Sequence, residues 1–349
     1  MTKTGTKIPK EEYLTTGKNI IIDQGKDSIA GYTDRQKGIF KEVPVIVFGD
    51  HTRIVKYVDK PFFLGADGVK VLKSKEKESN YKYLYYALKA AHIPNTGYNR
   101  HFKWLKQINI NYPDFNEQKN IVDILDSLTR VIKVRQKELA FFDKLIKARF
   151  VEMFGDPQDS KSKWKKSTIE KCCTLKSGKT LPRNIENEGG NIPYVKVKDM
   201  NSLENMTYIT TSTRFVSDKT ANKNIFPVGT VIFPKRGGAI GTNKKRLTKV
   251  PICADLNIMG VIPDNTRINS YYLFEYFNMV DLNTLNNGSS VPQINNKDIN
   301  PLNINIPPLS LQNEFANFVQ QVDKSKVAVQ KSLDETQKLF DSLMQEYFG

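Results

Sequence analysis

Apolar residues recur at alternating steps of three and four along two long stretches of the chain, one from Pro113 to Gly155 and one from Pro307 to Gly349. Such a narrow stripe is typical of a coiled-coil seam. Each stretch follows a proline and ends at a glycine, which suits the start and the stop of a helix. The pattern therefore predicts two long amphipathic helices.

The two helical stretches are copies of each other. One constant offset aligns Gln118 with Gln312 and Phe154 with Phe348 without a gap. The match begins upstream, at a short Asn-Ile-Asn run before each proline. A repeat of this kind indicates two half-proteins in series.

A lone amphipathic helix of this length needs a partner that covers its stripe. In one alternative each stripe docks on its own globular domain. The repetition favours the other alternative, in which the two helices cover each other as an antiparallel coiled coil. The residues expected at this interface are Ile121, Leu125, Leu128, Leu139, Ile146, Phe315, Val319, Val322, Leu333 and Phe340.

The segments that precede the two helices share an order of elements. Residues 1–112 and 156–306 each contain several strand-like runs, then an aromatic helix and a glycine-led polar loop. The sequence thus predicts an α/β (α+β) fold in which two globular domains alternate with two long helices. The expected divisions are 1–112, 113–155, 156–306 and 307–349.

Charge is the most informative part of the composition. Lys and Arg number 53 against 37 Asp and Glu, which gives a net charge of +16 over 349 residues. A basic protein of this size most often binds a polyanion such as nucleic acid, although a basic proteome also produces basic proteins without such a partner. No apolar run reaches 18 residues, and the N-terminus lacks the apolar core of a signal peptide. We therefore expect a cytoplasmic protein.

The glycine-rich run around Gly237 and Gly241 does not have the spacing of a phosphate-binding loop. It is better described as a glycine turn that presents basic and amide side chains, which can contact phosphates and base edges. The alternative is a solvated hairpin tip.

No catalytic constellation is found in the sequence. Asn305-Ile-Pro-Pro lacks the order of an adenine methyltransferase motif, and the three histidines are too scattered for a metal site. The three cysteines have no ligand spacing. We expect neither a metal nor a cofactor on this chain.

The repeated helices that start after a proline and end in Phe-Gly, the FGDHTR run at 48–53, the ADGVKVL run at 66–72 and the Trp164…Ser-Gly-Lys-Thr opening resemble the specificity subunit of type I restriction–modification systems. The resemblance covers nearly the whole chain. It implies two target recognition domains that each read half of a split DNA site, with the helices as a ruler between them. It further implies a non-catalytic subunit that recruits two methyltransferase subunits and ATP-driven restriction subunits. S-adenosylmethionine, ATP and Mg²⁺ would belong to those partners.

On this interpretation, DNA contacts come from polar and basic residues of both domains. His51 has the alternative of a turn residue that is satisfied locally. The expected contacts are Lys26, His51, Arg53, Arg100 and Lys103 in the first domain, and Lys196, Lys235, Arg236, Asn243, Lys244, Lys245, Arg246, Gln293 and Asn295 in the second.

One departure from the repeat concerns the first domain. Residues 5–9 resemble residues 178–182, so the first domain has no counterpart of the opening strand after Trp164. We expect this domain to be N-terminally shortened. Two other classes of function stay open: a coiled-coil adaptor with two protein-binding heads, and a nuclease with an unrecognised active site.

Overall fold

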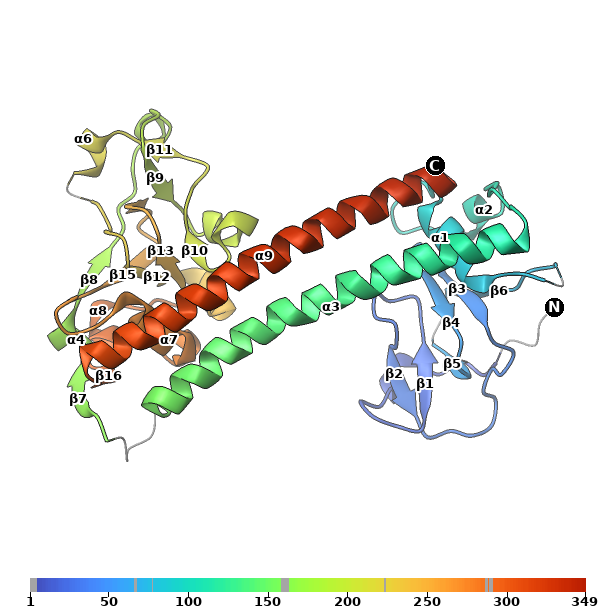
Figure 1. Cartoon of the computed structure of the whole chain (residues 1–349), viewed down its shortest axis with the longest axis horizontal. Helices are drawn as coiled ribbons and strands as arrows, with labels where there is room; N and C mark the ends of the chain where they lie inside the picture. Colours follow the sequence, from blue (N-terminus) through green and yellow to red (C-terminus); the bar gives the residue numbers. More distant parts are fainter. Residues whose placement is uncertain are drawn as a thin grey trace. The chain divides into compact units, whose positions relative to one another are not determined.

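The computed structural model describes residues 5–65, 68–76, 78–157, 163–222, 224–285, 288 and 291–349 (Figure 1). The chain packs into two compact units: unit 1 comprises residues 1–137 and 329–349, and unit 2 comprises residues 138–328. Both units contain part of each long helix, α3 (Phe115–Phe154) and α9 (Leu309–Phe348). The predicted α/β fold with two long helices is confirmed. Parts of the expected strand at 66–72, linker at 156–163 and loop at 288–297 lie outside the described residues.

Unit 1 contains two three-stranded sheets. The first has the order β2-β1-β5, formed by Gly31–Thr33, Asn19–Ile22 and Phe62–Leu64. The second has the order β4-β3-β6, formed by Val55–Val58, Val45–Gly49 and Val69–Leu72. The helical elements of this unit before α3 are η1 (Lys10–Glu12), α1 (Tyr81–Ala90) and α2 (Phe102–Leu105).

Unit 2 repeats both sheets and adds two strands to one of them. Its three-stranded sheet has the order β11-β9-β14, formed by Phe215–Val216, Ile192–Val195 and Cys253–Ala254. Its five-stranded sheet has the order β10-β13-β12-β15-β8, formed by Tyr208–Ile209, Arg246–Thr248, Val231–Pro234, Ile258–Pro263 and Cys173–Ser177. A separate pair joins β7 (Lys165–Thr168) to β16 (Asn303–Ile306).

Short helical elements connect the strands of unit 2. The α-helices are α4 (Ile169–Cys172), α5 (Arg183–Glu186), α6 (Asp218–Ala221), α7 (Ser270–Met279) and α8 (Asn296–Ile299). The 3₁₀ elements are η2 (Asp199–Asn201), η3 (Leu203–Asn205), η4 (Gly237–Thr242) and η5 (Leu282–Thr284).

Strand pairing shows that the two units share one framework. One three-stranded sheet in each unit has the same pairing: its first strand in chain order pairs antiparallel with its second and parallel with its third, β1 with β2 and β5, and β9 with β11 and β14. In each, a central antiparallel strand lies between two neighbours: β3 between β4 and β6, and β12 between β13 and β15. Among the described residues, unit 1 has no counterpart of β7, α4 and β8.

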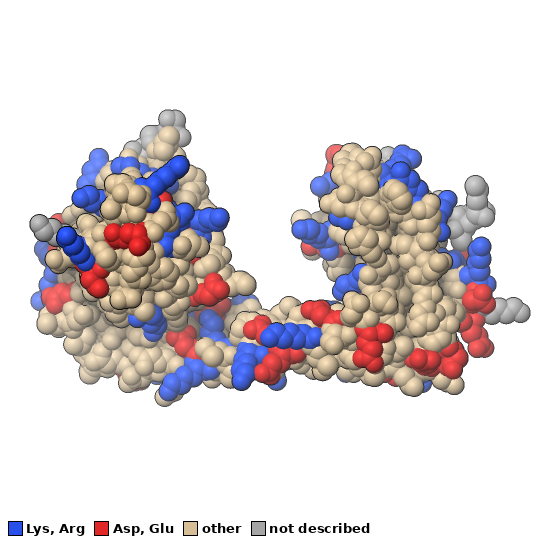
Figure 2. Space-filling model, turned by 90° about the horizontal axis from the view of Figure 1, so that it is seen from above, with Lys and Arg blue, Asp and Glu red and all other residues tan. Residues whose placement is uncertain are grey.

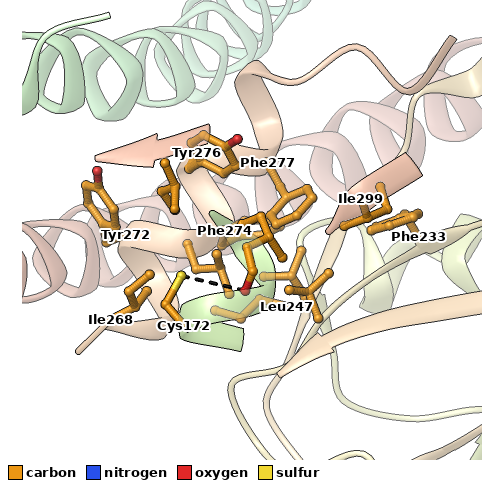
Figure 3. Packing of buried hydrophobic residues seen from close by; sticks show 14 of the residues in the cluster. Cys172, Phe233, Leu247, Ile268, Tyr272, Phe274, Tyr276, Phe277 and Ile299 are labelled. Carbon is orange, nitrogen blue, oxygen red and sulfur yellow. Dashed lines mark hydrogen bonds between the residues drawn. The ribbon is translucent and has the colours of Figure 1, made fainter. Parts of the chain in front are cut away.

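The stripes of α3 and α9 are buried against each other and against an aromatic helix in each unit. In unit 1, Ile121 and Leu125 of α3 and Phe340 of α9 pack on Tyr83 and Tyr86 of α1. In unit 2, Phe150 and Phe154 of α3 and Phe315 of α9 pack around Tyr272 of α7, whose own cluster appears in Figure 3. Each stripe is therefore covered both by the other long helix and by the globular domains, so the two alternatives considered from the sequence occur together.

Burial along the stripe and two ion pairs describe how the helices meet. Of the ten expected interface residues, Ile121, Leu125, Phe315, Val319, Val322 and Phe340 are buried, and Leu128, Leu139, Ile146 and Leu333 are half-buried. Within unit 2, Lys326 pairs with Asp143 at 2.6 Å and Arg149 pairs with Glu314 at 3.1 Å. The order of these two pairs shows that the helices run antiparallel.

The repeated glutamine fixes the start of each long helix to the aromatic helix. In unit 2, buried Gln312 accepts a hydrogen bond from the Asn269 amide at 2.8 Å and donates to the Pro307 carbonyl at 2.8 Å. In unit 1, Gln118 makes the same two contacts, with the Asn80 amide at 3.3 Å and the Pro113 carbonyl at 2.9 Å. Asn80 and Asn269 are the N-caps of α1 and α7. Both copies of the repeat thus share a hydrogen-bonded contact between the start of the long helix and the N-cap of the aromatic helix.

Replacement of Gln312 by alanine should destabilise unit 2 by about 2–4 kcal/mol, because it leaves a buried amide and a buried carbonyl without partners. Asn313→Ala is the matched control, since Asn313 is exposed and its bond to Asn269 is at the surface. Urea denaturation of both variants measures the difference. Equal effects of the two substitutions would contradict the role of Gln312.

Candidate DNA interface

In unit 1, three loops meet at one end of the β4-β3-β6 sheet. The turn after β3 contacts the loop after β1, because the His51 amide donates to Gln24 Oε1 at 3.2 Å and Thr52 Oγ1 donates to the Gln24 carbonyl at 2.6 Å. The loop before α2 joins them where the His101 amide donates to the Asp50 carbonyl at 2.8 Å. The expected contact residues of the first domain lie on these loops or next to them.

A stacked aromatic pair with one exposed member, Tyr98, marks this end of unit 1. The His51 ring stacks on Tyr98, with centroids 4.9 Å apart and planes 10° apart, and Tyr98 is 89% exposed. His51 is half-buried and its backbone amide is held within the turn, whereas its role as a DNA contact stays a prediction. Tyr98 was not predicted as a contact residue from the sequence. Its position as an aromatic residue within a glycine-led polar loop could have indicated it.

The predicted cations of unit 1 differ in accessibility. Lys26, Arg100 and Lys103 are exposed. Arg53 is half-buried, has a left-handed φ of 62°, and donates to the Ile93 carbonyl at 3.2 Å. Three cations are therefore presented to solvent, whereas Arg53 also ties the turn to the segment after α1.

The corresponding end of unit 2 is held by the same backbone hydrogen bonds as the loop end of unit 1. The Lys235 amide donates to the Asn257 carbonyl at 2.8 Å, as the Asp50 amide donates to the Gly68 carbonyl at 2.7 Å. The Lys235 carbonyl accepts from the Ile294 amide at 2.9 Å, as the Asp50 carbonyl accepts from His101. Lys235 and Asp50 therefore occupy equivalent backbone positions.

The side chains at these two equivalent positions are chemically opposite. Asp50 is buried and accepts from the Phe102 amide at 2.8 Å. Lys235 is 8% exposed and donates to Ser177 Oγ at 2.7 Å, and burial, with nearby Arg236, lowers its pKa. The framework is the same in both units, but the chemistry on it differs.

Beside Lys235, a second group of predicted contacts comes together. Arg236 is exposed and lies in a backbone bridge with Gln293, and the Gly237 amide donates to the Pro292 carbonyl at 2.8 Å. Gln293 in turn donates to Asn295 Oδ1 at 3.0 Å. Asn295 is the N-cap of α8 and forms a capping box with Asp298. The backbone contacts thus bring Gln293 and Asn295 close to exposed Arg236 in the fold.

The remaining predicted residues of the η4 turn are engaged within the protein. Asn243 accepts from the Leu282 amide at 2.9 Å, and Lys245 donates to Asn243 Oδ1 at 2.7 Å and to the Val280 carbonyl at 2.6 Å. Arg246 donates to the Met200 carbonyl at 2.9 Å, and Lys244 donates to the Asn201 side chain. Lys245 and Arg246 are 4% and 7% exposed. In contrast to the expectation from sequence, the turn does not present these two cations to solvent.

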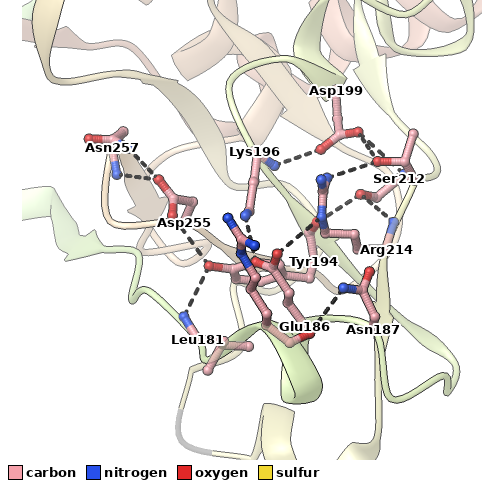
Figure 4. A network of polar contacts seen from close by, with 12 residues as sticks. Leu181, Glu186, Asn187, Tyr194, Lys196, Asp199, Ser212, Arg214, Asp255 and Asn257 are labelled. Atoms are coloured by element: carbon pink, nitrogen blue, oxygen red, sulfur yellow. Dashed lines mark hydrogen bonds and ion pairs between the residues drawn. The ribbon is translucent and has the colours of Figure 1, made fainter.

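Lys196 belongs to a network of charged side chains on the smaller sheet of unit 2 (Figure 4). Its ammonium lies 2.5 Å from Glu186, a carboxylate that is 6% exposed and also lies 3.5 Å from Arg214. Arg214 was not identified from the sequence, because its position beside Lys196 depends on the pairing of β9 with β11. Glu186 offsets part of the positive charge of the two residues.

Figure 2 shows how the charges are spread over one face of the molecule. On both units, Lys and Arg side chains project from the end away from the long helices, while acidic side chains are fewer there. On this face the long helices carry both signs. A polyanion would therefore meet positive potential at these ends of the units.

Comparison with known proteins assigns the family. The sequence profile described as "Type I restriction modification DNA specificity domain" matches residues 1–140 and 161–337. The chain belongs to this family. Its two matched segments each include one of the loop-bearing ends described above.

Individual relatives agree with this assignment. The specificity subunit of the type I restriction enzyme EcoR124I/EcoR124II from Escherichia coli is 24% identical over 347 residues, covering 90% of this chain and 82% of that protein. The MjaIX specificity subunit of Methanocaldococcus jannaschii is 23% identical over 69% of this chain and 60% of its own length.

Solved structures share the fold. The crystal structure of the type I restriction–modification S subunit from M. genitalium matches with a TM-score of 0.62 and 19% identity, covering 99% of this chain and 92% of that one. A chain from a structural study of type I complex assembly and conformational transition matches with a TM-score of 0.55 and 16% identity, covering 95% and 91%.

Along the described part of the chain, no helix is both long and apolar enough to cross a membrane. Over the same residues, His, Cys, Asp and Glu side chains form no group of three that could hold a metal ion.

The buried ammonium of Lys245 predicts a pH dependence. Burial lowers the pKa of Lys245 to about 8 from 10.5, although Asp281 opposes the shift. Between these values the unfolded chain binds more protons than the folded chain, so this group adds stability as the pH rises from 8 to 10.5. The added stability is at most roughly 3 kcal/mol.

Urea denaturation of the wild type and of Lys245→Met at several pH values checks this prediction. The wild-type free energy of unfolding should rise relative to that of the variant across the window, and Lys338→Met on α9 corrects for the loss of one lysine. A constant difference would show that the ammonium is not desolvated in the folded chain.

Proposed function

We propose that this chain is the DNA-specificity subunit of a cytoplasmic type I restriction–modification complex. Each unit carries one target recognition domain, within residues 1–112 and 156–306, and reads one half of a split duplex site. The helical segments 113–155 and 307–349 set the gap between the halves and bear the contacts to partner subunits. The chain itself performs no catalysis.

The observation that carries this proposal is the equivalence of Asp50 and Lys235. The same backbone hydrogen bonds hold both residues at the loop-bearing end of a unit, yet one side chain is an anion and the other a cation. Asp50 and Lys235 are themselves buried, and the exposed side chains on the loops around them differ between the two units. Base edges in the major groove differ in their pattern of donors and acceptors, so two ends with different exposed side chains read different sequences. A duplicated framework with divergent loops fits a protein that reads two half-sites.

The expected partners follow from the family. We assign the methylation step to two methyltransferase subunits that supply S-adenosylmethionine, and the cleavage step to restriction subunits that use ATP and Mg²⁺. The family assignment disfavours the adaptor and nuclease alternatives. The exposed cations of the loop-bearing ends supply the phosphate contacts that position the duplex.

Salt dependence tests the electrostatic part of the interface. The combined variant Lys26→Ala, Arg100→Ala, Lys103→Ala and Arg236→Ala removes four exposed cations from the proposed surface. Because each phosphate contact contributes roughly 0.9 to the slope of log K against log salt, the slope should flatten by about 2 to 4. Fluorescence anisotropy with a duplex, measured on the complex with the methyltransferase subunit, gives this slope.

A variant with the same loss of charge on the helices provides the control. Lys144, Lys324, Lys331 and Lys338 are exposed on α3 and α9, and their replacement by alanine should leave the slope nearly unchanged. Equal flattening in both combined variants would mean that total charge, and no particular surface, determines binding.

The split site is tested by mapping N6-methyladenine after co-expression with the methyltransferase subunit. We expect a motif of two half-sites with a fixed gap. Arg236→Ala should relax the specificity of one half-site only, and Arg100→Ala should relax the other only, since each guanidinium–base contact contributes about 1–3 kcal/mol. Relaxation of both halves by either single variant would contradict the assignment of one half-site to each unit.

A further inference from the structure

One exposed apolar side chain interrupts the polar surface at the loop-bearing end of each unit. In unit 1 this side chain is Tyr98, which is 89% exposed, and in unit 2 it is Val291, which is 64% exposed. Exposed cations lie beside both: Arg100 follows Tyr98 by two residues, and Arg236 forms a backbone bridge with Gln293, two residues after Val291. Single apolar residues are common on protein surfaces, so exposure alone assigns no role. The position of the two residues in the duplicated framework is the more informative observation.

Tyr98 and Val291 stand at equivalent positions. The amides of His101 and Ile294 donate to the two equivalent carbonyls after β3 and β12, at 2.8 and 2.9 Å, so these two residues align. Both are 0% exposed, and each anchors the end of its loop in the body of the unit. Tyr98 and Val291 lie three residues before these anchors. The two units therefore present an apolar side chain at the same place in the same loop.

A ring stack holds Tyr98 in place. His51 covers one face of the Tyr98 ring, with centroids 4.9 Å apart and planes 10° apart. His51 is half-buried and its amide donates to Gln24 Oε1 at 3.2 Å, so the supporting residue is fixed to its turn. The loop of Tyr98 is also bonded internally, because Asn99 Nδ2 donates to the Thr96 carbonyl at 2.5 Å. Tyr98 is thus an exposed ring with one covered face and a supported position.

The chemistry that Tyr98 and Val291 share limits what they can bind. Valine has neither a ring nor a hydroxyl, so base stacking and hydroxyl hydrogen bonding cannot be their common role. Insertion of Tyr98 between base pairs is disfavoured as well, because His51 already covers one face of the ring. In the major groove of duplex DNA the apolar group is the 5-methyl of thymine, and apolar side chains contact it.

We propose that Tyr98 and Val291 each contact the 5-methyl group of a thymine in the major groove, one thymine in each half-site. This inference rests on the proposed function and deepens it, because it names a base that each unit reads. Arg100 and Arg236 reach the neighbouring phosphates or guanine edges. His51 is a positioning residue, which acts through Tyr98.

Replacement of thymine by uracil in the duplex tests the contact, because it removes the 5-methyl and leaves the hydrogen-bonding edges unchanged. The methylation map first locates the half-sites, and each of their thymines, on either strand, is then replaced in turn. Fluorescence anisotropy on the complex with the methyltransferase subunit gives the affinity for each duplex. We expect one position in each half-site at which loss of the methyl weakens binding about threefold to fivefold.

Protein variants assign each of these positions to a unit. Tyr98→Ser should abolish the uracil effect in one half-site and leave the other unchanged, and Val291→Ser should do the converse. Direct contact between a side chain and a methyl appears as non-additivity of the two changes. Val228→Ser is the matched control and should preserve both uracil effects, because Val228 is 54% exposed and precedes β12, at the opposite end of that strand from Lys235.

The role of His51 is tested through the same uracil effect. His51→Ala removes the support of the Tyr98 ring and should reduce the effect in that half-site, whereas His51→Phe keeps a stacking ring and should preserve it. A merely structural role of His51 would weaken binding to the thymine and uracil duplexes equally. Tyr98→Leu keeps an apolar surface without a ring and should retain part of the effect.

Three outcomes would overturn the proposal. One is the absence of any uracil effect in a half-site, which includes a half-site without thymine. Another is a uracil effect that persists unchanged in Tyr98→Ser or in Val291→Ser, since other residues would then contact the methyl. A third is loss of the effect in both half-sites on substitution of either residue. These outcomes all require a mapped split motif; its absence would instead refute the proposed function, and this inference with it.

Discussion

The structure depends on the burial of one apolar stripe on each of two 40-residue helices. A helix of this length with a narrow stripe gains little stability alone, because most helical stability in proteins comes from packing of the apolar face. Each unit satisfies this requirement twice, by pairing segments of α3 and α9 and by docking the pair on an aromatic helix. The glutamine and tyrosine contacts at Gln118, Gln312, Tyr83 and Tyr272 fix the register of that docking.

This constraint explains why the helices and their entry segments are the repeated part of the sequence. A change in Gln312 or Tyr272 leaves a buried polar group without its partner, which is costly inside a packed core. The loops at the far end of each sheet are held by backbone–backbone bonds, such as those of Asp50 and Lys235, which do not depend on the side chain. The loops therefore tolerate divergence that the helices do not.

The same distinction decides what the sequence predicts. The helices follow from local periodicity, and the common order of elements follows from the repeat, so the fold class could be predicted. The burial of Lys245 and Arg246 could not be predicted. These side chains donate hydrogen bonds to the carbonyls of Val280 and Met200, which are distant in sequence. Likewise, the alignment of Asp50 with Lys235 is invisible to residue comparison, since the two side chains are opposite in charge and only the backbone bonds reveal it.

Divergence between the units also reaches the edge of the main sheet. A free strand edge normally carries a cost, because unpaired N–H and C=O groups invite pairing with other chains. In unit 1 this edge is short, since β6 has four residues, and Lys70 and Lys73 flank Leu72. A short edge that carries lysines pairs less readily with other chains.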